Sequence, residues 1–145
     1  MHTRQLTKAD FDQIVAVIDH WWGGPTTALA HPIFFYEFGS HALIAEEDGG
    51  MVGFLLGFIT AEPPSVGYIH LVGIDPAWRR RGVGRVLYQE FERRARSLGA
   101  ARLKAITTVG NQASLGFHRS LGYAMEQVPD YAGVGRARFV FTRDL

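Results

Sequence analysis

Apolar residues recur every three or four positions in several stretches of the chain, which is the spacing of one face of an α-helix. The apolar face of the first stretch consists of Phe11, Ile14, Val15 and Ile18, and that of the longest consists of Val83, Leu87, Phe91, Ala95 and Leu98. A capping-box pattern over 7–10 begins the first stretch, and Gly82 and Gly99 bound the longest. We therefore expect helices from 7 to about 21, 82 to 98 and 111 to 121, with a short helix over 32–38.

Other apolar runs are short and bounded by turn residues, as strands are. They cover 41–47, 51–59, 68–74, 103–109, 123–128 and 138–142. Asp48-Gly49-Gly50 predicts a hairpin between the first two, and the order strand, helix, strand over 68–109 predicts a parallel pair with a right-handed crossover. The expected fold class is α/β of mixed α+β type: a central mixed, mostly antiparallel sheet of about six to seven strands, flanked by about four helices.

Composition limits the classes of function. With 145 residues, 47% of them hydrophobic, the chain fits a single domain over 1–145. Its formal net charge of +1 gives no large positive field, so we expect neither nucleic acid nor a membrane as a partner. The first residues lack the apolar segment of a signal peptide, and no run has the roughly 20 apolar residues of a membrane span, so the expected location is cytoplasmic.

The chain contains no cysteine, which excludes disulfides, thiolate metal ligands and a covalent cysteine intermediate. No metal is expected. Any chemistry at the site must therefore use other groups.

The turn Arg79-Arg80-Arg81-Gly82-Val83-Gly84 joins a predicted strand to the longest predicted helix. The first amide N–H groups of a helix have no partners within it, and the helix dipole makes that end positive, so phosphate groups bind there. The two glycines leave these amides accessible, and the arginines, with Arg85, add positive charge. The alternative is a solvated turn whose glycines only permit a tight connection. The spacing matches neither a Walker motif nor a dinucleotide-binding fingerprint.

Two motifs resemble those of the GNAT acyltransferase superfamily. Its motif Arg/Gln-x-x-Gly-x-Gly/Ala after the fourth strand is matched by Arg79, Gly82 and Gly84. Its second motif is matched, later in the chain, by Asn111, Ser114, Phe117, Leu121, Gly122 and Tyr123. The resemblance extends over the whole chain in the order of elements. It implies the GNAT fold and an N-acetyltransferase that moves an acyl group from acetyl-CoA to a primary amine of a small molecule or peptide, by direct attack in a ternary complex.

The resemblance also implies where acetyl-CoA binds. The strands ending at Ile74 and Val109 would splay apart with the pantetheine arm between them, and the amides of 81–85 would hold the pyrophosphate. The residues expected to bind the cofactor are Val72, Ile74, Arg79, Arg80, Arg81, Gly82, Val83, Gly84, Arg85, Asn111, Ser114 and Phe117. For Asn111, capping of the helix that it begins is a second role, and both roles can coexist.

The general acid departs from the family pattern. The family places a tyrosine one residue after the aromatic of the second motif, where it meets the CoA sulfur, and this chain has His118 there. Free histidine titrates near pH 6.5, so a neutral imidazole is a poorer donor above that pH. His118 is the candidate acid, and the alternative is a histidine on the helix surface without a catalytic role.

His70 is the candidate general base because it is the best ionisable group of the predicted central strand, where it should share a face with Tyr68 and Val72. The family often has a glutamate on this strand, and this sequence has none. The alternative for His70 is a buried histidine bonded to the backbone. Glu46 and Glu37 are weaker candidates, and water can also take the proton.

Aromatic residues are the expected walls of the acceptor site: Trp21, Trp22, Tyr36 and Tyr131. Since Trp21 and Trp22 are adjacent at a helix end, they point in different directions, and both are not expected to be buried. We assign Phe34 and Phe35 to the core. The lack of a carboxylate cluster favours a small or moderately apolar amine over a polyamine.

A second class of function remains open, namely an acyl-CoA-binding sensor or regulatory module with the same fold and no catalysis. His118 in place of the family's tyrosine and the missing strand glutamate favour it. A nucleotide- or RNA-binding protein is a third class, which the nearly neutral charge argues against. Free sheet edges in this fold type allow a homodimer.

Overall fold

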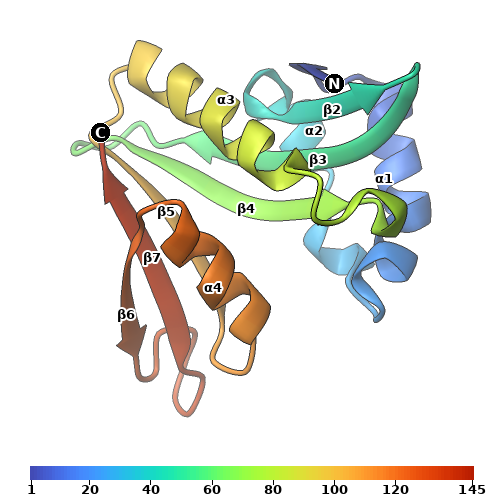
Figure 1. Cartoon of the computed structure of the whole chain (residues 1–145). Helices are drawn as coiled ribbons and strands as arrows, with labels where there is room; N and C mark the ends of the chain where they lie inside the picture. The colour runs from blue at the N-terminus through green and yellow to red at the C-terminus, as the bar shows by residue number, and fades with distance from the viewer.

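Seven strands form one sheet in the order β1-β2-β3-β4-β5-β7-β6 in this computed structural model, which describes residues 1–145 (Figure 1). The strands are β1 (His2–Gln5), β2 (Leu43–Glu47), β3 (Gly50–Ile59), β4 (Val66–Ile74), β5 (Arg102–Thr108), β6 (Ala124–Val128) and β7 (Arg138–Asp144). All neighbours are antiparallel except β4 and β5, which are parallel. The predicted mixed, mostly antiparallel sheet is confirmed. Strand β1 was not predicted, because its four residues carry no apolar pattern.

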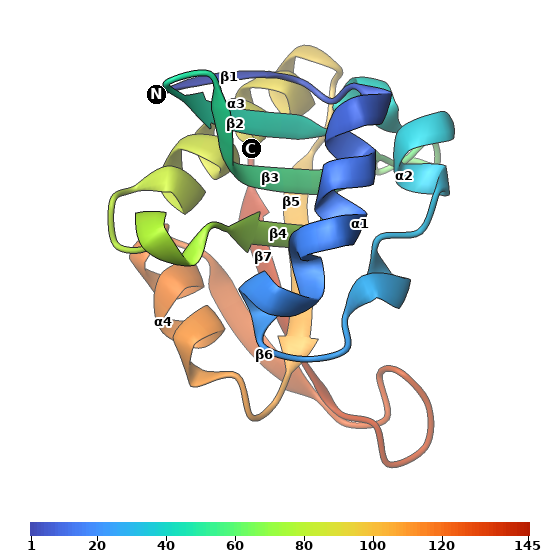
Figure 2. The same cartoon turned by 90° about the vertical axis from the view of Figure 1, so that its right-hand side faces the viewer.

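Helices cover both faces of the sheet. They are α1 (Lys8–Trp22), α2 (Ile33–Tyr36), α3 (Val83–Ser97) and α4 (Gln112–Ser120), with 3-10 turns η1 (Thr27–Leu29), η2 (Gly39–His41) and η3 (Pro76–Trp78). Helix α1 crosses one face, and α3 lies behind the sheet in the same view (Figure 2). The capping box at the start of α1 forms as predicted, with Thr7 and Asp10 bonded to each other's backbone N–H. The helix predicted over 32–38 is shorter than expected.

The buried apolar residues form two clusters, one on each face. The cluster under α3 contains Leu87 and Phe91, and the cluster under α1 contains Ile14 and Ile18, as the helical spacing predicts. Two residues of the predicted apolar faces are exposed: Val15 on α1, at 37%, and Leu98, at 57%, because α3 ends at Ser97. The two cores pack the sheet between α1 and α3, and both helices contribute residues to the site.

Strands β4 and β5 pair over only part of their length. Their register runs from Val66 opposite Arg102 to Ile69 opposite Ala105, although both strands continue beyond these residues. Past this point the strands diverge, with α3 on one side of the opening and α4 on the other (Figure 1). The splayed parallel pair expected from the resemblance is therefore present.

His70 is an extra residue in β4. Leu56 pairs with Leu71 and Gly57 pairs with Ile69, so no residue of β3 lies opposite His70. A bulge of this kind interrupts the alternation of side chains and bends the strand. As a result Ile69 and Leu71 belong to the cores on opposite faces. The prediction that His70 shares a face with Val72 is wrong for this reason, because Val72 packs on the α3 side whereas His70 stacks on α2.

The edges of the sheet are β1 and β6. These are the free edges on which the homodimer prediction depends, and it stays a prediction. Neither α1 nor any other helix combines the length and the apolar character that a membrane crossing requires.

Candidate active site

A cleft of about 780 Å³ opens where β4 and β5 part. Its walls come from the end of α1, β4, the turn after β4, the first half of α3, β5 and α4. The walls contain three arginines and two histidines, and they contain no aspartate or glutamate. No three His, Cys, Asp or Glu side chains lie together in a way that could hold a metal ion. The charge of the cleft favours an anion.

The start of α3 presents free backbone N–H groups to this cleft. Gly82 is the N-cap, with φ 80° and no side-chain cap, and Arg80 also has a left-handed φ of 62°. The N–H groups of Val83, Gly84 and Arg85 have no hydrogen-bond partner in the protein, while Val86 is the first to bond within the helix. All three line the cleft. This end of a 15-residue helix is therefore a ready anion site.

The arginines of this turn have different surroundings. Arg80 and Arg85 line the cleft without an ion-pair or hydrogen-bond partner. Arg79 donates a hydrogen bond to the carbonyl oxygen of Trp21 and so ties the turn to the end of α1. The Arg81 guanidinium lies 4.9 Å from the Trp78 ring centre, and Arg81 does not line the cleft. Arg80 and Arg85 are thus the free cations here, while the prediction for the Arg81 side chain finds no support.

The outer edge of β4 supplies further polar backbone groups. Asp75 donates its N–H to Val52 on β3 at 2.9 Å. Since N–H and C=O groups alternate between the two edges of a strand, those of Ile74 and Val72 point away from β3 and into the gap. The Trp22 indole Nε1 already donates to the Val72 carbonyl oxygen at 3.1 Å. These are the two positions at which pairing with pantetheine was predicted.

Helix α4 forms the opposite wall. Asn111 Oδ1 accepts the N–H of Ser114 at 3.1 Å, and Asn111 Nδ2 donates to Thr107 Oγ1 at 3.2 Å, so the residue caps α4 and fixes it to β5. The capping role is confirmed, and Asn111, Ser114 and Phe117 all line the cleft as expected. Gly84 lets α3 approach closely here, because a Cβ at position 84 would lie 3.1 Å from the Phe117 ring.

His70 has one bound and one free ring nitrogen. Its Nε2 lies 2.8 Å from the carbonyl oxygen of Leu29, and its ring stacks on Phe34 with 4.2 Å between ring centres. A nitrogen that faces a carbonyl oxygen carries the proton, so Nδ1 holds the lone pair, and Nδ1 has no partner. Burial lowers the pKa of His70 and keeps the ring neutral. The expected backbone bond is present, and it leaves a basic nitrogen in a residue that lines the cleft.

His118 has no free ring nitrogen. Its Nδ1 lies 2.8 Å from the Ser114 carbonyl oxygen and its Nε2 lies 2.9 Å from the Tyr88 hydroxyl. The ring is stacked on Phe141 with centres 4.0 Å apart, and the residue is only 5% exposed. Burial lowers the pKa of His118. The alternative of a surface histidine is therefore wrong, and direct proton donation by His118 finds no support in its geometry.

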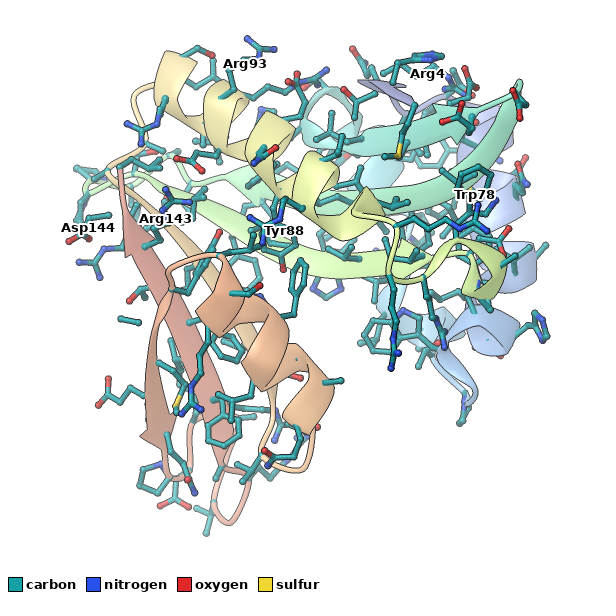
Figure 3. The ribbon with its side chains drawn as sticks, in the orientation of Figure 1. Arg4, Trp78, Tyr88, Arg93, Arg143 and Asp144 are labelled. Carbon is teal, nitrogen blue, oxygen red and sulfur yellow. The ribbon has the colours of Figure 1, made fainter.

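Tyr88 is a cleft residue that was not predicted from the sequence. It lies on α3 (Figure 3) and is the only tyrosine of the cleft. Its hydroxyl lies 2.9 Å from His118 Nε2. A signal existed in the sequence. Tyr88 follows Gly84 by four residues and so lies on the same face of the helix, one turn further on.

The predicted acceptor residues divide into two pairs. Trp21 is buried and Trp22 is 45% exposed, and both line the cleft. Tyr36 is 63% exposed on α2 outside the cleft, and Tyr131 lies outside it as well, with Lys104 Nζ 5.2 Å from its ring centre. The structure thus brings the two tryptophans to the site and leaves both tyrosines outside.

The two weaker base candidates also lie elsewhere. Glu46 forms an ion pair with Arg4 at 2.9 Å, and neither Glu46 nor Glu37 lines the cleft. His70 is therefore the one predicted base that reaches the cleft.

Comparison with known proteins adds independent evidence. The sequence model of the acetyltransferase (GNAT) family matches residues 8–123. The N-alpha-acetyltransferase RimI of Mycobacterium tuberculosis is 34% identical over 85 residues, which are 58% of this chain and 52% of that protein. The L-2,4-diaminobutyric acid acetyltransferase of Nocardia farcinica is 29% identical over 89 residues, 61% of this chain and 46% of that protein. The matched region thus spans about half of the length of these relatives.

Among solved structures, one chain in the crystal structure of the NatC complex bound to Gag peptide and CoA superimposes with a TM-score of 0.83 at 16% identity. The match covers 99% of this chain and 98% of that one. At this identity the similarity concerns the fold, and the fold agrees with the family match.

Proposed function

This chain belongs to the acetyltransferase (GNAT) family, and on that premise we propose that it is an acetyl-CoA-dependent N-acetyltransferase whose single domain spans 1–145. One observation carries the proposal. The cleft joins free helix N–H groups and two unpaired arginines to a strand edge with outward-facing backbone groups, and it has no carboxylate. An anion linked to an extended amide chain has the shape and polarity of CoA.

The residues present fit this co-substrate. The amides of Val83, Gly84 and Arg85 suit the diphosphate, and Arg80 and Arg85 add charge-assisted hydrogen bonds. Val72 and Ile74 offer the pantetheine amides a strand edge. The Val72 carbonyl has a second lone pair beside the Trp22 bond, so Trp22 need not leave for pantetheine to bind.

The acceptor is proposed to attack the thioester directly. With no cysteine in the chain, a covalent cysteine intermediate is excluded, and a ternary complex is the simpler scheme. An amine is protonated in water, and His70 is the proposed base that takes the proton which must leave before attack, because its Nδ1 is left with the lone pair when Nε2 bonds to the Leu29 carbonyl oxygen. Binding both reactants in one cleft supplies the orientation, which in well-aligned cases lowers a barrier by roughly 7 to 11 kcal/mol.

The acceptor is proposed to be a primary amine of a small molecule or a peptide N-terminus. The two tryptophans and the lack of carboxylates favour an amine of moderate polarity over a polycation. The names of the two relatives agree with an amine acceptor, one by N-alpha-acetylation and one by an amino acid.

The test is thiol release from acetyl-CoA over a panel of amines, amino acids, aminoglycosides and peptides. Because the chain has no cysteine, the protein adds no thiol background. Release that depends on both enzyme and amine supports the transferase and identifies the acceptor class. An acetyl-CoA-induced rise in melting temperature without release over the panel would instead favour the sensor.

A further inference from the structure

The hydrogen-bonded pair of Tyr88 and His118 has no role in the function proposed so far. We propose that Tyr88 is a catalytic residue that carries a proton from the attached amine nitrogen to the departing sulfur, with His118 as the positioning residue that holds Tyr88's own proton in transit. This inference rests on the proposed function. It differs from direct donation by His118, which its geometry does not support.

The hydrogen bonds of His118 show which residue donates and which accepts in the pair. His118 Nδ1 lies 2.8 Å from the Ser114 carbonyl oxygen, which can only accept, so Nδ1 carries the ring proton. Nε2 therefore holds the lone pair, and the Tyr88 hydroxyl, 2.9 Å away, donates to it. The Tyr88 hydroxyl donates its proton to His118 and accepts no hydrogen bond within the protein, so the lone pairs of Oη are free to accept a proton.

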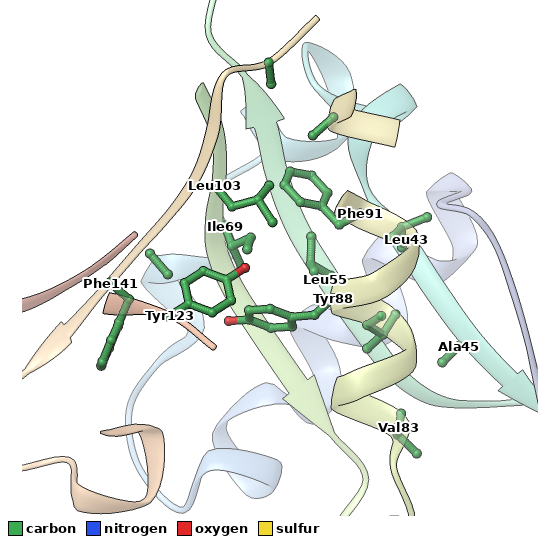
Figure 4. Close-up of a cluster of buried hydrophobic side chains, with 14 of the residues drawn as sticks. Leu43, Ala45, Leu55, Ile69, Val83, Tyr88, Phe91, Leu103, Tyr123 and Phe141 are labelled. Carbon is green, nitrogen blue, oxygen red and sulfur yellow. The ribbon is translucent and has the colours of Figure 1, made fainter. Parts of the chain in front are cut away.

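The location of the pair suits the reacting atoms. The pairing of β4 and β5 ends at Ile69 and Ala105, and these two residues line the cleft together with Tyr88 and His118. Tyr88 extends from α3 toward Tyr123 and the strand that carries Phe141 (Figure 4). His118 stacks on Phe141, which pairs with Ala105 on β5. The pair therefore lies beside the point at which β4 and β5 part.

Other hydroxyl groups of the cleft lack such a partner. Ser120 donates to the Phe117 carbonyl oxygen, and Thr107 accepts from Asn111. The Ser114 hydroxyl reaches only the Nδ1 side of His118, at 3.3 Å. Tyr88 is the one hydroxyl of the cleft that is joined to the basic nitrogen of an imidazole.

Every proton that moves in the proposed reaction has a donor and an acceptor among these groups. After attack the amine nitrogen and the sulfur are bonded to the same carbon, so one hydroxyl can reach both. Tyr88 Oη takes the extra proton from this nitrogen while the Tyr88 proton moves to His118 Nε2. The C–S bond then breaks with its electron pair left on sulfur. Tyr88 gives a proton to that sulfur and recovers its own from His118, so the amide and the free thiol form and the pair returns to its starting state.

The surroundings of the pair favour transfer without accumulation of charge. Burial raises the pKa of Tyr88 and lowers that of His118, so both are neutral at rest. The groups packed on His118 are Ser114 and Phe117 of α4, Tyr123 before β6, and Phe141 of β7, none of them charged. In transit the Ser114 carbonyl, which accepts from Nδ1, stabilises the imidazolium.

The first experiment measures kcat and the KM for acetyl-CoA in Tyr88→Phe, His118→Phe and the double variant, with melting temperatures. General acid–base groups contribute typically about 10²- to 10⁴-fold, so we expect Tyr88→Phe to lower kcat about 10²-fold or more with little change in KM. Because the two residues act as one unit, the double variant should be no slower than the slower single variant. Tyr123→Phe is the matched control, since it removes a buried hydroxyl that has no partner and lies outside the cleft.

The outcomes separate the two proposals. A wild-type protein without amine-dependent thiol release overturns the proposed function and the shuttle with it. An active wild type whose Tyr88→Phe variant keeps its kcat overturns the shuttle alone. Losses that multiply in the double variant would show that His118 does not act through Tyr88.

A second measurement does not depend on activity. Long-range ¹H–¹⁵N spectra of the wild type at neutral pH, assigned by comparison with His118→Phe, should show His118 protonated at Nδ1 and bare at Nε2. In Tyr88→Phe the Nε2 resonance should shift as its hydrogen bond is lost. A wild-type His118 that carries its proton on Nε2 would overturn the shuttle, even if a variant failed to fold.

Discussion

Two histidines line the cleft from opposite walls, His70 on β4 and His118 on α4. Each has one nitrogen against a backbone carbonyl oxygen at 2.8 Å, each stacks on a phenylalanine, and burial lowers the pKa of both. They differ in the remaining nitrogen, which is free in His70 and bonded to Tyr88 in His118. The partner of the second nitrogen therefore decides whether a buried histidine can act on a substrate directly or only through another residue.

The largest expected effect is the loss of kcat when His70 is replaced. His70→Ala should lower kcat by about 10²-fold or more, because the free Nδ1 is the base that we assign. Added imidazole should restore part of the rate, because His70 lines the cleft and the space left by its side chain can be filled from there. His118 is only 5% exposed and its ring is stacked on Phe141, so imidazole should restore the rate of His118→Ala much less. Equal rescue of both variants would remove the distinction between the two walls.

The next largest effect is on the KM for acetyl-CoA, and it comes from the anion site at the start of α3. Replacing Arg80 and Arg85 together by alanine should raise the KM for acetyl-CoA by roughly tenfold or more, because hydrogen bonds to charged groups contribute about 1.5–3 kcal/mol each. The kcat should change little. Arg81→Ala is the control, because Arg81 does not line the cleft and its guanidinium lies over the Trp78 ring, so its loss should leave the KM near that of the wild type.

The pH dependence tests the lowered pKa that His70 and His118 share. Both histidines have a pKa below the ordinary value of 6.5 and must be neutral to accept a proton, so kcat should stay level on the acid side down to about pH 6.5 and fall below it. The free energy of unfolding should also decrease on acidification. The unfolded chain binds these protons first, so the free energy of unfolding decreases as the pH falls from 6.5 through the lowered values. Denaturation at several pH values checks this, and a stability that rises on acidification would contradict the burial of both rings.

The smallest effect concerns the α4 wall alone. Asn111→Ala removes the cap of α4 and the bond to Thr107, and should lower the free energy of unfolding by about 1 kcal/mol. Asn111→Asp keeps the capping oxygen and is the matched control. If urea denaturation gave Asn111→Ala the stability of the wild type, α4 would not depend on this cap.

Local features of the fold and site followed from the sequence. The turn from Arg79 to Gly84 and the cap at Asn111 depend on residues only a few positions apart, so their spacing was sufficient. The helices and strands were found where apolar periodicity is strong, whereas the polar edge strand β1 was not.

Long-range features did not follow from the sequence. The bulge at His70 comes from the register between β3 and β4, and Tyr88 meets His118 across 30 positions. Arg79 bonds to the carbonyl of Trp21, 58 positions away. Tyr36 and Tyr131 lie outside the cleft for the same reason, because only tertiary packing decides which aromatic side chains face it.

In the proposed reaction the acyl group passes directly from acetyl-CoA to an amine while both are bound in the cleft. The most direct test is the initial rate of thiol release with acetyl-CoA and the best amine of the panel varied against each other. We predict double-reciprocal lines that intersect, as a ternary complex requires. Parallel lines would indicate an acylated enzyme and contradict direct attack.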